Sequence, residues 1–415
     1  MASIAEAPAQ PAPRQGTLAA LRFPNFRLYF VGQLISLSGT WMQNVAQGWL
    51  VFSLTRSELW LGVVACAAGL PSLVLSPFAG VMVDRIPRRK ILLVSQTVQM
   101  ILAFILAWLA FANAVQVWHI VVLAFVLGLT NAIDAPARQA IIVDLVGKKD
   151  LTSGITLNSI MFNSARVFGP VAAGIALVQF GPAWCFFING ASFIAVIFML
   201  WIMKVEGSVR FVGDFAPLER LKEGLQYARR HSTIAPLLLL AGITSLLTIN
   251  LSTMLPAFAD EVLHSPKIAY SSMMMSWGIG AVIAGIFMTT LGRRFGRGRV
   301  VFAMVIFVTI AAIFFSLTTD VNAAVFLMGL YGFGIILEFV TVNTLIQSEV
   351  PDEFRGRVMS LYTLTFFGVA PFGALGLGLL AQAITTPPAM LIYAVIGGIL
   401  SFYVMFRSPK VRALP

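Results

Sequence analysis

The chain has 415 residues, of which 59% are hydrophobic and 11% are charged, and its formal net charge is +11. Soluble domains are about 45–50% apolar and about 25% charged, so this composition excludes an ordinary soluble protein and indicates a chain embedded in lipid. The basic residues are spread over many segments rather than gathered on one face, which argues against nucleic-acid binding. The two cysteines lie in or beside apolar segments, so no disulfide framework is expected.

Apolar stretches near the roughly 20 residues that cross a bilayer follow one another along the chain. In order they cover residues 29–52, 59–83, 91–112, 117–135, 152–179, 183–203, 234–259, 270–291, 300–317, 322–346, 358–384 and 389–406. These twelve stretches predict an all-α integral membrane protein with six-helix bundles at 29–203 and 234–406. Residues 1–28 and 407–415 are the expected tails, and 204–231 is the expected linker.

The positions of the basic residues predict the orientation. Of the 28 Lys and Arg residues, 25 lie in the tails, the linker and the loops that follow even-numbered spans. Only Arg56 and Lys267 lie in the other loops, and Arg166 lies inside the fifth span. By the positive-inside rule, both tails and the linker are cytoplasmic. We therefore expect a multi-pass protein of the plasma membrane, which is the inner membrane of a bacterium.

Within the linker, apolar residues recur at helical spacing opposite basic ones. They are Phe215, Leu218, Leu221, Leu225 and Ala228. This pattern predicts a helix that lies along the inner membrane surface. A solvated linker with accidental periodicity is the alternative.

The second half of the chain repeats the first after a shift of 204 positions. The shift aligns Gly169 with Gly373 and Gly174 with Gly378. Few residues are identical after the shift, but the spans, the loop lengths and the positions of the charged residues correspond. A repeat of six and six spans with cytoplasmic ends is the layout of secondary transporters, whose substrate site lies between the halves near the middle of the bilayer.

Two motifs carry a family resemblance. Gly80, Asp84, Arg85, Arg88 and Arg89 follow the spacing of the signature G-x-x-x-D-R-x-G-R-R, with Pro87 at its second glycine. Gly169, Pro170 and Gly174 follow G-x-x-x-G-P-x-x-G-G, with Ala165 and Ala173 at two of its glycines. With these motifs the chain resembles the major facilitator superfamily over nearly all its length. Residues 26–29, 39–43 and 158–174 resemble the drug:proton antiporter branch that contains macrolide efflux pumps and the enterobactin exporter.

The resemblance implies the major facilitator fold, with two pseudo-symmetric bundles, and a conformational latch on the cytoplasmic side. In this latch Asp84 would accept from the N-terminus of the eleventh span, and Arg88 would pair with Asp144. Arg293, Glu349 and Arg355 would form the counterpart in the second half. Opening the cytoplasmic side would break these contacts. In the fifth span, Pro170 lacks a donor and Gly169 permits close approach, which predicts a bend against a neighbouring span.

Three ionisable side chains lie inside spans, namely Asp134, Arg166 and Glu338. Each costs at least about 2.5–3.5 kcal/mol there, so each is a candidate for proton coupling. The 204-residue shift makes the two acids equivalent, and desolvation favours the neutral form of a carboxyl group. Arg138, one turn after Asp134, could instead neutralise it, although Pro136 intervenes. Glu338 has no base near it in sequence and is the preferred proton carrier.

The first span carries a polar stripe of Gln33, Ser36, Thr40, Gln43 and Gln47 at spacings of 3 and 4. Such a stripe is expected to face water or ligand, and the alternative is hydrogen bonding between helices without ligand contact. The other candidates for the lining of the substrate cavity are Asn44, Asn131, Asn163, Thr244, Thr248 and Trp277.

We expect a secondary active transporter that exports a lipophilic or amphipathic small molecule, of drug or siderophore type, in exchange for protons by alternating access. The alternatives are a lipid or lysolipid flippase of the same fold and a non-transporting receptor or scaffold. The sequence contains no phosphate-binding loop, metal cluster or nucleophile constellation, so an enzyme is not expected. We expect a monomer without metal or cofactor, whose partners are the substrate, protons and membrane lipid.

The charge distribution predicts that residue 222, in the linker, faces the cytoplasm. A Lys222→Cys variant without Cys66 and Cys185 should resist an impermeant thiol reagent in intact cells and react after permeabilisation. Lys267→Cys, in a loop predicted to face outward, should react in intact cells and serves as the control. Labelling of residue 222 from outside would contradict the topology.

Overall fold

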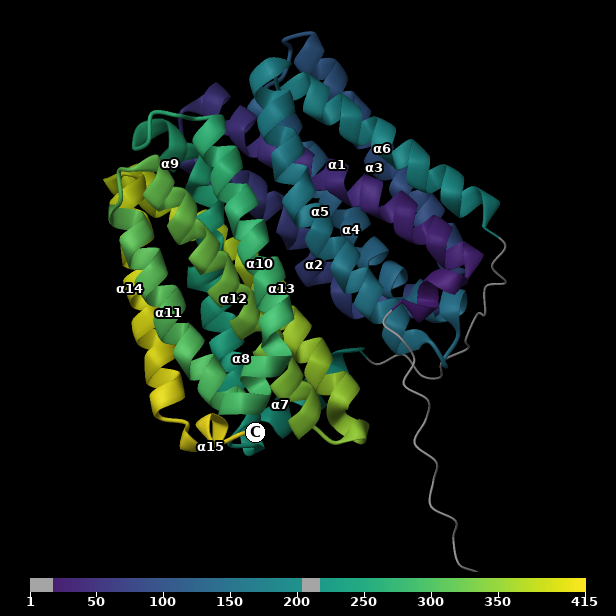
Figure 1. The fold of residues 1–415 in the computed structure, drawn as a ribbon, viewed down its shortest axis with the longest axis vertical. Coiled ribbons are helices and arrows are strands. Elements are labelled where there is room, and N and C mark those ends of the chain that lie inside the picture. The colour runs from purple at the N-terminus through teal and green to yellow at the C-terminus, as the bar shows by residue number, and fades with distance from the viewer. Residues whose placement is uncertain (1–17, 204–216) are drawn as a thin grey trace, which may run out of the picture.

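A computed structural model describes residues 18–203 and 217–415, with all but a few of their side chains. The first half comprises η1 (Ala19–Arg22), α1 (Pro24–Thr55), α2 (Glu58–Arg85), α3 (Arg88–Phe111), α4 (Val117–Val146), α5 (Leu151–Gln179) and α6 (Pro182–Ile202). These helices form one bundle, tilted against the bundle of the second half (Figure 1).

The second half begins with α7 (Pro217–Arg230), followed by a seventh span in four pieces. These are α8 (Ile234–Ile243), the π-helical turn η2 (Thr244–Thr248), the 3-10 turn η3 (Ile249–Met254) and α9 (Leu255–Glu261). Then come α10 (Ile268–Phe295), α11 (Arg297–Leu317), α12 (Val321–Glu349), α13 (Asp352–Ile384), α14 (Thr386–Phe406) and α15 (Pro409–Arg412). The predicted all-α fold of two six-helix bundles is confirmed.

Eleven helices of the described residues are long and apolar enough to cross a bilayer. The first span, α1, is not among them, because its polar stripe lowers its mean hydropathy. The fourth span runs well past its predicted end, since α4 continues through Pro136 to Val146. Charged side chains near residue 135 interrupt the apolar run in the sequence, but in the structure they are partly or fully buried against neighbouring helices.

Helix α7 contains the described part of the predicted amphipathic linker helix. It packs against α13, where Arg357 pairs with Glu223 at 2.8 Å. Its Ala228 is buried and its Leu225 is exposed. Phe215 and the side chain of Leu218, which belong to the predicted apolar face, lie outside the described residues.

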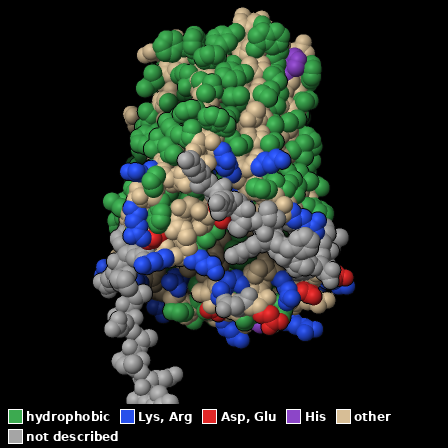
Figure 2. Space-filling model, turned by 90° about the vertical axis from the view of Figure 1, so that its right-hand side faces the viewer, with side chains coloured by type: hydrophobic (Ala, Val, Ile, Leu, Met, Phe, Trp, Pro, Cys, Tyr) green, Lys and Arg blue, Asp and Glu red, His purple; other side chains and the backbone are tan. Residues whose placement is uncertain are grey.

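Lys and Arg side chains gather on one part of the surface, below a hydrophobic band (Figure 2). We call this the basic end; it carries α7 and α15, whereas α9 lies at the opposite end (Figure 1). At the opposite end, a single apolar core joins residues of both halves, such as Val45, Phe186, Phe258 and Met390. Toward the basic end, each half has a core of its own. A single core therefore joins the two halves at the opposite end, whereas at the basic end their cores are separate and α2 contacts α7.

Close helix contacts join the two halves along α2 and α13 and along α5 and α10. A Cβ atom on Gly62 of α2 would lie 2.6 Å from the carbonyl oxygen of Ala374 in α13. Within the first half, a Cβ atom on Gly169 of α5 would lie 2.3 Å from Cβ of Trp41 in α1. Because real Cβ atoms do not approach this closely, the helix separation at both points requires glycine.

A Gly169→Ala variant is expected to be destabilised by about 1–3 kcal/mol, because the added methyl group overlaps Trp41 and the backbone of α1. The matched control is Gly285→Ala in α10, where a Cβ atom would meet nothing within 4 Å. The better helix propensity of Ala should leave that variant at least as stable as the parent. Apparent melting temperatures in detergent provide the measurement, and equal values for both variants would contradict the packing argument.

Candidate functional site

Glu338 is a buried carboxylate in the second half, with 3% of its surface exposed. It lies on α12, and the Thr244 hydroxyl donates to its Oε1 atom at 2.7 Å. Within the described residues it forms no ion pair with Lys, Arg or His. Its hydrogen-bond partner within the described residues is therefore a neutral hydroxyl.

The helix that presents Thr244 to Glu338 is irregular at that point. Thr244 begins the π turn η2, and the 3-10 turn η3 follows it. Asn250 donates to the carbonyl oxygen of Ser245 at 2.7 Å, and Tyr331 of α12 donates to that of Thr248. The π and 3-10 turns interrupt the regular helical hydrogen bonding, and these side chains donate to backbone carbonyl groups at the interruption. Such single π turns occur frequently at functional sites.

Asp134, the equivalent residue of the first half, is fully buried in a different environment. Arg138 Nε lies 2.7 Å from its Oδ2 atom, and Gln96 of α3 donates to Oδ1 at 3.0 Å. Ser95 also donates to Oδ1. Pro136 does not prevent the ion pair, because α4 continues through it. The two acids thus differ: Asp134 has a cation and two donors, whereas Glu338 has one hydroxyl.

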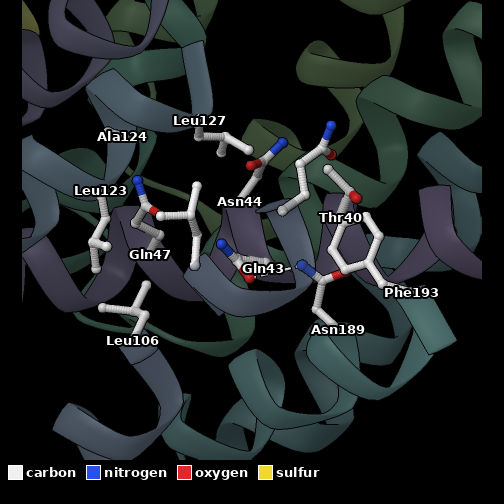
Figure 3. A pocket seen from close by; sticks show the side chains of 12 residues that line it. Thr40, Gln43, Asn44, Gln47, Leu106, Leu123, Ala124, Leu127, Asn189 and Phe193 are labelled. Atoms are coloured by element: carbon white, nitrogen blue, oxygen red, sulfur yellow. Dashed lines mark hydrogen bonds between the residues drawn. The ribbon is translucent and has the colours of Figure 1, made fainter. Parts of the chain in front are cut away.

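A small polar cavity lies inside the first bundle, between α1, α3, α4 and α6 (Figure 3). Its polar lining comes from Thr40, Gln43, Asn44, Gln47, Gln99 and Asn189. Its volume of about 20 Å³ suits one water molecule. In this conformation the cavity is too small for an organic substrate.

The polar stripe of α1 faces its own bundle. Asn189 of α6 donates to Gln43 at 2.7 Å, Ser36 donates to Gln96 of α3 at 3.4 Å, and Gln33 is fully buried. Thr40 bonds back to the carbonyl oxygen of Ser36. Ser36 and Gln43 thus bond helix to helix, whereas Thr40, Gln43 and Gln47 also line the small cavity.

The sequence reasoning missed the partners of that stripe. Ser95, Gln96 and Gln99 of α3 and Asn189 of α6 are buried polar residues within apolar spans. The signal was available, since three polar residues within five positions of one span indicate a polar face.

The remaining predicted cavity residues are scattered. Asn131 is partly buried on α4, and Asn163 donates to the carbonyl oxygen of Ser159 on its own helix. Thr248 offers its carbonyl to Tyr331, and Trp277 is buried on α10 beside Trp41 and Arg166. The structure therefore does not bring the predicted lining residues together around one described cavity.

The helix-bend motif lies where α5 contacts both halves. Pro170 is buried within α5, and Gly169 packs on Trp41 of α1. A Cβ atom on Gly174 would lie 3.1 Å from Cβ of Ser271 in α10. The motif thus permits close packing of α5 on both of its neighbours.

At the basic end of the first half, Arg88 donates to Asp144 at 2.7 Å and to the carbonyl oxygen of Ala140 at 3.0 Å. Arg89 donates to the carbonyl oxygens of Leu200 and Trp201 at 2.6 Å each. The exposed Arg85 lies at the end of α2. Gly80 and Asp84 lie in the same helix, but the surroundings of Gly80 and the side chain of Asp84 are outside what the structure describes.

In the second half, Arg355 donates to the carbonyl oxygens of Gln347 and Val350. Arg293 and Glu349 are exposed, and within the described part of the chain neither forms an ion pair. These contacts of Arg88, Arg89 and Arg355 each lie within one half. The latch role itself remains a prediction.

At the opposite end, polar contacts cross between the halves. Arg56 pairs with Asp260. The Thr386 hydroxyl lies 3.3 Å from Glu58 Oε1 and 2.9 Å from Glu261 Oε2, and its single proton can bond only one of them at a time. The ammonium group of Lys267 lies 5.0 Å from the ring centroid of Trp49. Arg56 and Lys267, the two exceptions to the charge rule in the sequence, both take part in these contacts at the opposite end.

Two bundles that share a core at one end and part at the other, with buried carboxylates on equivalent helices, define a membrane transporter of the major facilitator superfamily. The match to one family model extends over residues 15–413. The chain belongs to that family, which is described as transmembrane secretion effectors.

The named relatives are a transporter, an efflux protein and an exporter. The staphyloferrin A transporter of Staphylococcus aureus is 22% identical, covering 86% of this chain and 89% of its own. Macrolide efflux protein A of Streptococcus pyogenes is 22% identical, covering 88% and 92%. The enterobactin exporter of Escherichia coli is 22% identical, covering 94% of both chains. The resemblance to the efflux branch, drawn from the motifs, is confirmed, and the chain is a transporter rather than an enzyme.

The fold also matches solved transporters. A bacterial homologue of the human lysosomal transporter Spinster, inward-facing and occupied, superposes with a TM-score of 0.71 at 15% identity. The match covers 94% of this chain and 98% of the other. At this identity the likeness concerns the fold alone.

The Asp134–Arg138 pair yields a stability prediction. Arg138→Met should destabilise the protein by about 3–5 kcal/mol, because it leaves the fully buried Asp134 charge unpaired. Adding Asp134→Asn should recover most of that loss, because the charge is then removed. Melting temperatures of both single variants and the double variant form the cycle. Additive losses would show that the two side chains are not coupled.

Proposed function

We propose that the protein exports a lipophilic or amphipathic small molecule in exchange for protons, with Glu338 as the proton carrier. The single observation that carries the proposal is the site of Glu338. This carboxylate is 3% exposed, has no ion pair within the described residues and is bonded by Thr244 at the irregular turn of the seventh span.

The chemistry of that site favours a group that changes its charge. A buried carboxylate without a cation is costly, and one neutral hydroxyl compensates it only in part. Binding a proton removes the cost, and contact with water on either side of the membrane allows the proton to leave. Asp134 is less suited to this role, because Arg138 at 2.7 Å stabilises its charged form.

Alternating access supplies the motion. In this conformation the halves are joined through Arg56, Asp260, Glu58, Thr386 and Glu261 at the opposite end, while the basic-end cores are separate. The other state would break these contacts and bring the basic ends together, where the predicted latch of Asp84 and Arg88 would act. Protonation of Glu338 shifts the equilibrium between the two states by the difference between the free energies of proton binding in each state.

The relatives support the direction of transport and the class of substrate. Their names describe a staphyloferrin A transporter, a macrolide efflux protein and an enterobactin exporter. We infer that this chain also exports amphipathic organic molecules. We further infer that it acts as a monomer in a bacterial plasma membrane, with both termini and the basic end in the cytoplasm, as the charge distribution indicates.

Glu338→Gln should abolish substrate accumulation driven by a pH gradient, because the amide mimics the protonated carboxyl group and cannot release a proton. Exchange of labelled for unlabelled substrate without a gradient should persist. Both rates are measured in proteoliposomes with a substrate found by thermal stabilisation of the purified protein.

Glu219→Gln is the matched control, since Glu219 is an exposed residue of α7 and is not part of the predicted latch. Most surface substitutions are nearly neutral. The pH-driven accumulation of substrate by this control variant should therefore lie within about twofold of that of the parent. A Glu338→Gln variant that still concentrates substrate against its gradient would remove Glu338 from the coupling mechanism and transfer the role to Asp134.

A further inference from the structure

Arg166 is the third ionisable residue inside a span, and aromatic rings surround it. It lies about halfway along α5, where α1 and α5 of the first half meet α10 of the second. Its guanidinium carbon lies 5.2 Å from the ring centroid of Trp41, 5.1 Å from Phe162 and 4.8 Å from Trp277. We call these three rings and Arg166 the aromatic cage.

The cage has unused hydrogen-bond donors. Within the described part of the chain, Arg166 forms no hydrogen bond or ion pair, and its Nε atom is buried. The indole Nε1 atom of Trp277 is likewise buried without an acceptor. A guanidinium group is permanently charged and has five N–H donors, so Arg166 cannot act by releasing a proton. This argues against the proton-coupling role that the sequence suggested for it.

Other arginines in sheltered positions are paired. Arg88, whose side chain is 11% exposed, has Asp144 at 2.7 Å, and Arg138, at 21%, has Asp134 at 2.7 Å. Each of these pairs lies within one bundle. Arg88 and Arg138 are thus each compensated by a carboxylate, whereas Arg412, over the rings of Phe302 and Phe406, donates to the carbonyl oxygen of Phe406. At Arg166, which lies at the junction of the two bundles, rings take the place of that carboxylate.

The rings compensate the charge only in part. Arg166 is half-buried and Phe162 is exposed, so the removal of the charge from water is partial. A cation–π contact contributes about 0.5 to 2 kcal/mol between exposed and desolvated positions, whereas full removal of an ion from water costs several kcal/mol. Moreover, ring faces do not accept the in-plane N–H bonds of a guanidinium group as oxygen atoms do. An anion with two oxygen atoms would supply both the missing charge and the missing acceptors.

We propose that the aromatic cage binds the anionic group of the transported molecule, and that the substrate class is amphipathic organic acids with a flat apolar body. The carboxylate or similar anion would bond to Arg166 and Trp277 Nε1, and the apolar body would pack on the rings of Trp41 and Phe162. Because the cage takes Trp277 from one half and the other three residues from the other, the site is complete only while the halves are together at this depth. This proposal rests on the transport function proposed above.

Binding of a matched pair of probes tests the proposal. We would compare 2-naphthoate with 2-naphthamide, which share the ring and differ in charge, by thermal stabilisation of the protein in phosphatidylcholine nanodiscs at equal pH on both sides. The parent should bind the acid at least tenfold more tightly than the amide. Arg166→Gln should remove this preference, and Arg166→Lys should retain part of it.

Three controls complete the experiment. Arg407→Gln, at an exposed position near the C-terminus, should keep the full preference. Trp277→Phe retains a ring but lacks the N–H donor, so it should lose part of the preference even if Arg166→Gln fails to fold. The third control is the pH-driven accumulation assay, which depends on Glu338, whereas this binding assay uses no pH gradient. Failure of proton coupling is thereby distinguished from failure of the anion site.

Equal affinities for the two probes, no binding of either, or a preference that survives Arg166→Gln would overturn the proposal. A lipid headgroup is the other source of the same anion. If phosphatidylglycerol in the nanodisc stabilises the parent but not Arg166→Gln, and naphthoate shows no preference over naphthamide, the cage binds lipid and the assignment to a transported acid is wrong.

Discussion

The structure depends on one constraint, which is that a charge within the bilayer must be compensated by the protein itself, because water is absent there. The three ionisable residues inside the predicted spans meet this constraint differently. Asp134 has the guanidinium group of Arg138, Glu338 has the hydroxyl of Thr244, and Arg166 has three aromatic rings. Asp134 is fully compensated and forms a fixed ion pair. Glu338 and Arg166 are compensated only in part, so Glu338 can bind a proton and Arg166 can bind an anionic ligand.

The same constraint explains the packing of the first bundle. The amide and hydroxyl groups along α1 would be costly in contact with lipid, so they turn toward α3 and α6 and bond to Gln96 and Asn189. Between the bundles the arrangement differs, because a transporter has to separate them. One core and a few polar contacts join the halves at the opposite end, and each half keeps its own core at the basic end. Each bundle is thus fully packed in itself, and the junction is the part that can change.

The two acids show how far the internal repeat can be used for inference. The 204-residue shift placed Asp134 and Glu338 at equivalent positions, and both are buried in α4 and α12. The repeat did not reveal that their surroundings differ. Ser95 and Gln96 reach Asp134 from α3, whereas Glu338 is met by the irregular seventh span. Local sequence indicated Arg138 as a partner, since it is one turn away, but no local pattern indicated Thr244, which is 94 positions away.

The sequence alone determined the twelve spans, the two bundles and the family, because hydrophobic length and motif spacing are local properties that the bilayer constrains strongly. It also marked Asp134, Arg166 and Glu338 as exceptional, since a charge in an apolar run is visible without a structure. Only the tertiary structure decided that the polar stripe of α1 bonds to its own bundle, that a π turn faces Glu338, and that Arg166 lies among rings from both halves. These features depend on which helix faces are in contact, and side chains distant in the chain decide that through packing.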